Sequence, residues 1–315
     1  MGGSVGLALK KAGTDLKISG YDPDDETMKT ARDMDAVDST NWKLGGLAAD
    51  ADIVVITVPV TGLEKSLQSI GFYLKEHALV LDMSAAKQKG QEWAAQYLER
   101  GHYVGVRPIL TAQAMQSGRT GLDGADADLF RNSVYCLMPA PTADPKAVET
   151  AVNMGLLLGA KPFFLDAAEF DSLAQGVQTL PGLAGAALFR ALAATPGWRD
   201  MLRFAQVPFA QATMPLADHD EVAYQAIENQ AATLRWLDAY LAELKQIRDW
   251  IYAGEDKRLQ ALLDQLNSER ERWLQERTQN VWQEEHPLLK DYEPPSFMQS
   301  MFGRLASGRD KDKDK

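Results

Sequence analysis

The chain has 315 residues, and its 33 Lys and Arg against 44 Asp and Glu give a formal net charge of −11. That acidity argues against nucleic acid or an anionic membrane surface as the main partner. Hydrophobic residues make up 45% and charged residues 24%, which is typical of a folded globular protein and not of a disordered chain. The length predicts about two domains.

Cysteine and histidine are scarce, and apolar runs are short. The single cysteine, Cys136, excludes an intrachain disulfide, and no close His/Cys pair indicates a metal site. The first residues, MGGSVGLALKKAG, do not read as a signal peptide. No apolar run approaches the ~20 residues that cross a bilayer. We therefore expect a cytoplasmic protein with no membrane span and no metal.

Strands and helices alternate over the first half of the chain. The pattern predicts helices over 4–12, 24–34, 61–76 and 86–100, and strands over 16–22, 50–60, 78–83 and 102–106. The run 50–60 is rich in β-branched residues, as expected for a parallel strand buried on both faces. This alternation predicts an α/β fold with a doubly wound, Rossmann-like parallel sheet over 1–165.

Part of a dinucleotide-binding signature stands at the start. Gly2 and Gly3 open the first predicted helix, and Asp22 closes the next strand 20 residues after Gly2. The first strand and two further glycines of the signature would precede Met1, so we expect the natural chain to begin upstream. Asp22 would bind the adenosine ribose and repel a 2′-phosphate, which favours NAD over NADP. Alternatively, Asp22 is only a turn residue in YDPDD.

From about residue 166 the strand patterns end. A helix is predicted over 169–193 with a break near Pro181. Over 221–252 the apolar residues follow a helical spacing and predict a long amphipathic helix: Leu234, Leu237, Leu241, Leu244, Ile247 and Ile251. We expect 166–285 to be an all-helical dimerisation domain. Residues 286–315 are interpreted as a linker and tail, in which 296–305 would form a short helix docking on a partner or on its own chain.

The order of motifs resembles one family, the prephenate dehydrogenases of tyrosine biosynthesis. The matching segments are GGSVGLALKKAG, GYDPD, ADIVVITVPV, LVLDMSAAK, YVGVRP, ADLFRNSVYCLMP and LGAKPFFLDAAEFDSLAQGVQTLPGL. The resemblance covers roughly residues 1–250. It implies NAD as cofactor, a homodimer, and cofactor-binding residues that comprise Gly2, Gly3, Ser4, Asp22, Val58 and Pro59.

The resemblance also locates the chemical positions, and five of them differ here. The family's catalytic histidine corresponds to Arg107, and the serine that holds it corresponds to Ala85. The serine and histidine of a later motif correspond to Gln178 and Thr179, and a carboxylate-binding arginine corresponds to Met214. The candidate pocket residues are therefore Arg107, Ser84, Lys87, Gln178 and Thr179.

Two leading functions remain open at this point, beside a third, a helical scaffold protein that uses its C-terminal extension. The first is an NAD-dependent dehydrogenase that oxidises prephenate, arogenate or a related carboxylated hydroxy compound. The alternative is a catalytically degenerate, nucleotide-binding homodimer with a regulatory or scaffolding role. The alternative arises because an arginine stays protonated at any pH below about 12, so Arg107 cannot accept the substrate proton.

Overall fold

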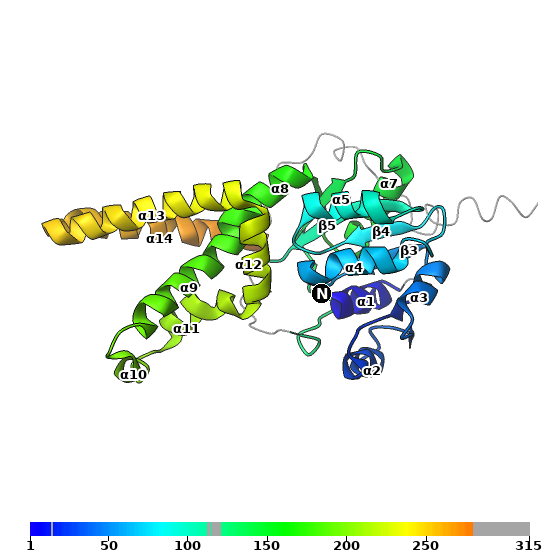
Figure 1. Cartoon of the computed structure of the whole chain (residues 1–315), viewed down its shortest axis with the longest axis horizontal. Coiled ribbons are helices and arrows are strands. Elements are labelled where there is room, and N and C mark those ends of the chain that lie inside the picture. Colours follow the sequence, from blue (N-terminus) through cyan, green and yellow to red (C-terminus); the bar gives the residue numbers. More distant parts are fainter. Residues whose placement is uncertain (14, 112–113, 115–120, 280–315) are drawn as a thin grey trace, which may run out of the picture.

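The structure is a computed structural model that describes residues 1–13, 15–111, 114 and 121–279. It has an α/β half followed by a helical half that extends away from it (Figure 1). The elements of the first half are α1 (Gly2–Lys11), β1 (Ser19–Gly20), α2 (Asp25–Asp33), β2 (Ser39–Thr40), α3 (Leu44–Asp50), β3 (Ile53–Ile56), α4 (Val60–Ile70), β4 (Leu79–Asp82), α5 (Lys87–Tyr97), β5 (His102–Ile109), β6 (Val134–Pro139), α7 (Pro145–Leu157) and β7 (Lys161–Phe164).

The main sheet has five strands in the order β3-β4-β5-β6-β7. Its pairs are parallel except β5 with β6, which run antiparallel with Arg107 opposite Cys136. β1 and β2 form a separate parallel pair. The predicted doubly wound α/β fold is thus confirmed for a sheet that is mainly, but not wholly, parallel.

Alternate residues of the central strands enter two different cores. Leu79 and Leu81 of β4 pack on the face covered by α1 and α7, whereas Val80 packs with Leu63 of α4 and Trp93 of α5. Successive side chains of a strand point to opposite faces, so one run of apolar residues serves both layers. This two-sided burial explains the continuous β-branched pattern of the sequence.

Several predicted elements are shorter than expected. Hydrogen-bonded pairing limits the strand predicted over 16–22 to Ser19–Gly20 and the one over 50–60 to Ile53–Ile56. The helix predicted over 61–76 ends at Ile70. Gly71 follows, and a Cβ there would lie 2.0 Å from the Tyr97 carbonyl oxygen, so the chain leaves the helix where it touches a neighbouring backbone.

The second half of the described chain is helical throughout. Its elements are α8 (Ala167–Ala174), the π-helix η1 (Gln175–Thr179), α9 (Leu180–Ala193), α10 (Trp198–Met201), α11 (Val207–Thr213), the 3₁₀ helix η2 (Met214–Asp218), α12 (His219–Glu228), α13 (Gln230–Ala253) and α14 (Asp256–Gln279). The helix predicted over 221–252 is interrupted at Asn229, between α12 and α13. The break predicted near Pro181 takes the form of η1, which adds a residue to the turn before that proline.

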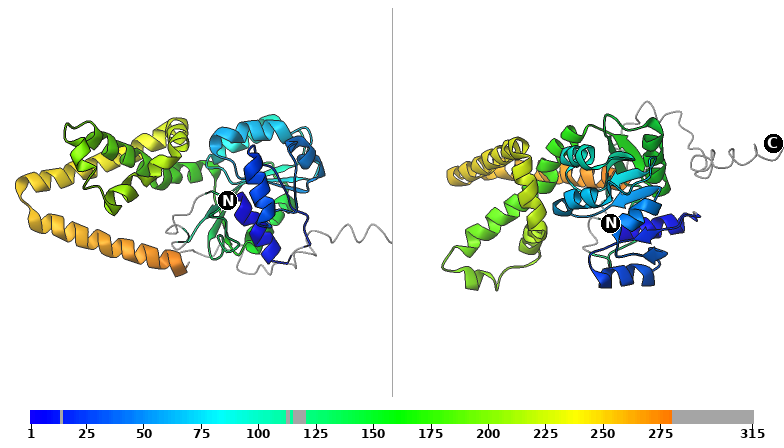
Figure 2. Two further views of the ribbon diagram at one scale, coloured as in Figure 1. Left: turned by 90° about the horizontal axis from the view of Figure 1, so that it is seen from below. Right: turned by 45° about the vertical axis from the view of Figure 1, so that its right-hand side comes forward.

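The last two helices form a hairpin. Gly254 has a φ of +70°, a left-handed conformation that ends α13 and reverses the chain. In Figure 2, α13 runs outward and α14 returns toward the α/β half. A hydrogen bond from the Arg277 guanidinium to the Leu110 carbonyl attaches the end of α14 to the residue after β5.

Candidate active site

The first turn of α1 is open to an anion. No side chain caps this helix and no acidic residue stands in its first turn. A Cβ at Gly2 would lie 2.8 Å from the Thr57 hydroxyl, and one at Gly3 would lie 2.5 Å from a Leu122 methyl, so both glycines allow close packing. Unpaired backbone N–H groups and the helix dipole make such a terminus a binding site for phosphate.

The other predicted cofactor residues lie in different surroundings. Asp22 follows β1 and is partly exposed, and its carboxylate accepts a hydrogen bond from the Asp24 amide at 3.0 Å. The turn role and a ribose-binding role are compatible, because a carboxylate has several acceptor sites. Val58 and Pro59 lie between β3 and α4. Ser4 is buried, and its hydroxyl accepts a hydrogen bond from the Asp126 amide at 3.1 Å, which gives it a structural task.

A buried polar network surrounds the carboxylate at the end of β4. Asp82 accepts hydrogen bonds from the Ser84 amide at 2.8 Å, the Ser84 hydroxyl at 3.0 Å and the Tyr103 hydroxyl at 2.7 Å. Glycine at position 90 leaves room for this network, since a Cβ there would lie 2.3 Å from the Tyr103 hydroxyl. Ser84, a predicted pocket residue, is therefore part of the interior framework.

Lys87 completes this network from the first turn of α5. Its ammonium donates to the Asp82 carbonyl at 2.7 Å and to the Asp82 carboxylate at 3.3 Å, and both side chains are fully buried. Burial lowers the pKa of Lys87 to about 8, while the Asp82 carboxylate partly opposes that shift. Because both hydrogen bonds of the ammonium go to buried oxygens of Asp82, Lys87 and Asp82 form a structural ion pair at the β4–α5 junction.

The helical half contributes Asp171 to the same junction. The Asp171 carboxylate of α8 accepts hydrogen bonds from the Lys87 amide at 2.9 Å and the Gln88 amide at 2.8 Å. It is buried, and burial raises its pKa although the two N–H groups favour the ionised form. Asp171 thus caps α5, whose own N-cap residue is Ala86 and offers no side-chain hydrogen bond.

Arg107 lies on β5 just beyond this junction. Its guanidinium makes one hydrogen bond within the described part of the chain, to the Met83 carbonyl at 2.8 Å. Burial lowers the pKa of the guanidinium, while Glu221 of α12 and Asp82 favour the charged form. A guanidinium has five N–H donors, so Arg107 has donors left for a ligand.

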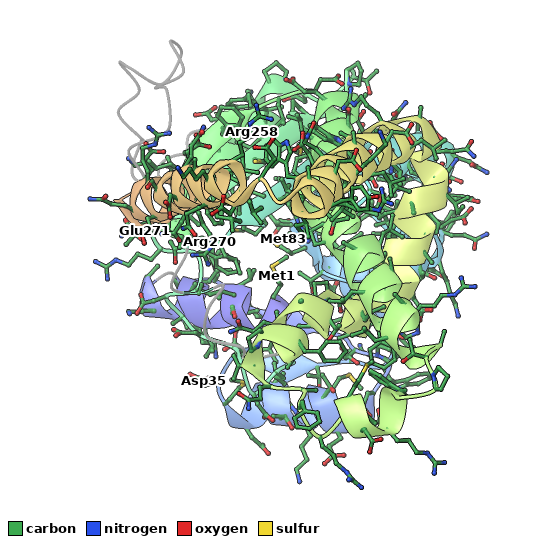
Figure 3. All side chains as sticks on the ribbon, turned by 90° about the vertical axis from the view of Figure 1, so that its left-hand side faces the viewer. Met1, Asp35, Met83, Arg258, Arg270 and Glu271 are labelled. Carbon is green, nitrogen blue, oxygen red and sulfur yellow. The ribbon has the colours of Figure 1, made fainter. Side chains whose placement is uncertain are left out.

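The Arg107 guanidinium lies close to the N-terminus of α1. Figure 3 shows Met83 beside Met1, in the space between α14 and α1. Burial, and then the positive charge of Arg107, lower the pKa of the Met1 amine, so the guanidinium lies near the start of α1. The N-terminus of α1 and the Arg107 guanidinium therefore face the same region, at the carboxyl ends of β4 and β5, where open α/β sheets bind their ligands.

The remaining predicted positions lie in or near the helical half. Gln178 and Thr179 both fall in η1, with Gln178 exposed and Thr179 buried. π-Helical turns occur frequently at functional sites. Met214, at the start of η2, is exposed. Ala85, by contrast, is buried in the α/β half, in the loop between β4 and α5, and its methyl side chain cannot hydrogen-bond to Arg107.

Two further residues, Tyr103 and Asp171, hold the framework of the site without having been predicted to do so. Tyr103, whose pKa is raised by burial and by Asp82, donates to Asp82 from the middle of the sheet. Asp171 lies inside α8, whose own N-cap residue is Asp166, so no local capping pattern marks its role at α5. The sequence alone does not tell that the partner of Tyr103 is the Asp82 carboxylate or that the partners of Asp171 are amides of α5.

Comparison with known proteins assigns the class. Residues 5–163 match the family model "Prephenate dehydrogenase, nucleotide-binding domain". The chain is 27% identical over 258 residues to the prephenate dehydrogenase of Bacillus subtilis, covering 80% of this chain and 67% of that protein. It is also 22% identical over 262 residues to the cyclohexadienyl dehydrogenase of Zymomonas mobilis, covering 81% and 86%.

Solved structures show the same fold. Prephenate dehydrogenase from A. aeolicus, in complex with hydroxyphenyl propionate and NAD+, superposes with a TM-score of 0.74 at 21% identity, covering 86% of this chain and 93% of that one. Synechocystis arogenate dehydrogenase gives a TM-score of 0.67 at 25% identity, covering 86% and 96%. The fold and the match over half of the chain define a nucleotide-binding protein of the dehydrogenase class. The chain belongs to the prephenate dehydrogenase family, as the order of its motifs predicted.

Within the described residues, no helix has the length and apolar character needed to cross a membrane.

Proposed function

We propose that this protein is an NAD-dependent dehydrogenase that oxidises a cyclohexadienyl carboxylate, prephenate or arogenate. The observation that carries the proposal is the convergence of an uncapped helix N-terminus and a largely buried guanidinium at the carboxyl ends of β4 and β5. The relatives named above support this class of substrate. The matched family model supports the nucleotide.

The residues around α1 fit NAD. The amides of Gly2 and Gly3 would bind the pyrophosphate, and the Asp22 carboxylate would accept hydrogen bonds from the ribose hydroxyls. Val58 and Pro59 would line the adenosine. A negative charge at Asp22 disfavours a 2′-phosphate, which supports NAD over NADP. When bound, the nicotinamide supplies the hydride acceptor.

Arg107 would hold a substrate carboxylate. Hydride departure leaves positive charge on the carbon that carries the hydroxyl, and a permanent cation beside that hydroxyl would oppose the reaction. The same cation binds a carboxylate well through charge-assisted hydrogen bonds. With arginine at this position, the hydroxyl proton would leave to water, and general-base catalysis worth about 10²–10⁴-fold would be lost.

The quaternary and cellular assignments belong to the same proposal. Leu234, Leu241, Leu244 and Ile251 of α13 are 49%, 54%, 45% and 62% exposed, and a second copy would cover such a stripe. We propose a homodimer through the helical half, a division of the chain near residue 165, and a cytoplasmic location. The docking segment 296–305 lies outside the described residues.

A direct test uses the purified, full-length protein with NAD and either prephenate or arogenate. Calorimetry would measure NAD binding, and fluorescence would follow NADH formation. We expect NAD to bind and NADH to form slowly with one of the two substrates. Binding of NAD without any NADH over hours would favour the degenerate alternative. Absence of NAD binding would refute both functions.

A further inference from the structure

The loop that positions Arg107 is held from both ends. It comprises Met83–Ala86, between β4 and α5, and its Met83 carbonyl accepts the hydrogen bond of Arg107 at 2.8 Å. At the β4 end, Asp82 binds the Ser84 amide and hydroxyl. The geometry of the Met83 carbonyl therefore depends on both ends of a short, buried loop.

The α5 end of this loop is held by the helical half of the protein. Asp171 accepts the first free amides of α5, those of Lys87 and Gln88, across 84 and 83 residues of chain. Helix N-termini usually obtain this cap from the residue directly before them, and here that residue is alanine. The first amides of α5 are thus capped by the helical half and not by the residue before the helix.

Asp171 is itself fixed by two helices. The Gln175 side chain donates to the Asp171 carbonyl at 3.3 Å and accepts from the Thr233 hydroxyl of α13 at 3.2 Å. Asp171, Gln175 and Thr233 are all buried. A continuous chain of hydrogen bonds therefore runs from α13 through η1 and α8 to the amides of α5.

We infer that Asp171 is a positioning residue for Arg107. It holds the start of α5, the start of α5 fixes the Met83 carbonyl, and that carbonyl orients the guanidinium toward the ligand. The inference rests on the proposed function for the identity of the ligand, which is a carboxylate. It does not require Arg107 to take part in proton transfer.

The test compares two carboxylates on one helix. Asp171→Ala removes the cap of α5, whereas Asp166→Ala removes the cap of α8 itself, where Asp166 accepts from the Ala168 and Glu169 amides. Calorimetry with saturating NAD would measure affinity for 4-hydroxyphenylpropionate. We expect Asp171→Ala to weaken this ligand about tenfold, and Asp166→Ala to stay within about twofold of the wild type.

A double-variant cycle separates positioning from general weakening. If Asp171 acts through Arg107, then Asp171→Ala introduced into an Arg107→Ala protein should change affinity by less than about twofold. Asp171→Asn keeps one acceptor oxygen and should bind the ligand with intermediate affinity. This milder change also serves if Asp171→Ala does not fold.

Hydrogen exchange supplies a readout that needs no ligand. The peptide that carries the Lys87 and Gln88 amides should exchange about tenfold faster in Asp171→Ala, and at the wild-type rate in Asp166→Ala. Unchanged exchange, unchanged affinity, or equal losses in both Arg107 backgrounds would overturn the inference. If the wild type binds no carboxylate while exchange behaves as expected, the proposed function fails and the holding of the loop by Asp171 stands.

Discussion

The buried ammonium of Lys87 predicts an unusual dependence of stability on pH. The surroundings lower its pKa from 10.5 to about 8. Between these values the unfolded chain binds more protons at this position than the folded chain does, so the free energy of unfolding rises with pH across that window. At about 1.4 kcal/mol per pKa unit, the rise contributed by this group is about 3 kcal/mol.

Replacement by methionine isolates that contribution. We expect the stability of the wild type relative to Lys87→Met to increase from pH 8 to pH 10.5, measured by urea unfolding followed by circular dichroism. Lys75→Met is the matched control, because the Lys75 side chain is 42% exposed and pairs with Asp52 on the surface. Asp82→Asn combined with Lys87→Met tests whether the unpaired carboxylate distorts the comparison. Parallel pH profiles for wild type and Lys87→Met would refute the reasoning.

Three further predictions concern catalysis, cofactor choice and assembly. Arg107→His combined with Ala85→Ser should oxidise prephenate faster than either single variant, because the serine would hold the imidazole. NADH fluorescence would measure the rates. A double variant no faster than Arg107→His would contradict this prediction. Asp22→Ser should weaken NAD binding about tenfold and strengthen NADP binding, as measured by calorimetry with both nucleotides. If Asp22 is only a turn residue, the ratio of the NAD and NADP affinities would not change. Light scattering should give about twice the 34.7 kDa chain mass for the wild type. The double variant Leu241→Glu with Leu244→Glu, which places charges on the exposed face of α13, should give one chain mass. A monomeric wild type would exclude the dimer.

The architecture was largely predictable from periodicity. Val80 and its neighbours on β4 alternate between two cores, and that arrangement produces the continuous apolar runs of the sequence. The ends of elements were less predictable. Helix α4 stops where Gly71 meets the Tyr97 carbonyl, a contact between segments 26 residues apart. The proline predicted a break near residue 181, whereas the π-helical form of that break and the interruption at Asn229 had no local signal.

Some residues of the candidate site could also be predicted from the sequence, and others could not. Arg107 was located by the motif around it, and its chemistry follows from the residue type alone. The tasks of Ser84 and Lys87 were not predictable, because both side chains turn inward to Asp82. Asp171 was not identified for a simpler reason, since its partners are amides of α5 in the other half of the chain. Sequence locates side chains with special chemistry more readily than the residues that hold them in place.

The two halves touch through three separate helices. Asp171 of α8 holds the start of α5, Glu228 of α12 pairs with Lys89 at 3.5 Å, and Arg277 of α14 binds the carbonyl that follows β5. A domain attached through one contact can rotate about it as a hinge. Contacts on several different elements restrict both rotation and translation of the helical half relative to the α/β half. Rigid-body opening would break all three attachments together. We therefore expect ligands to enter by rearrangement of side chains and short loops, with the spacing between the nucleotide and the substrate groups kept constant throughout.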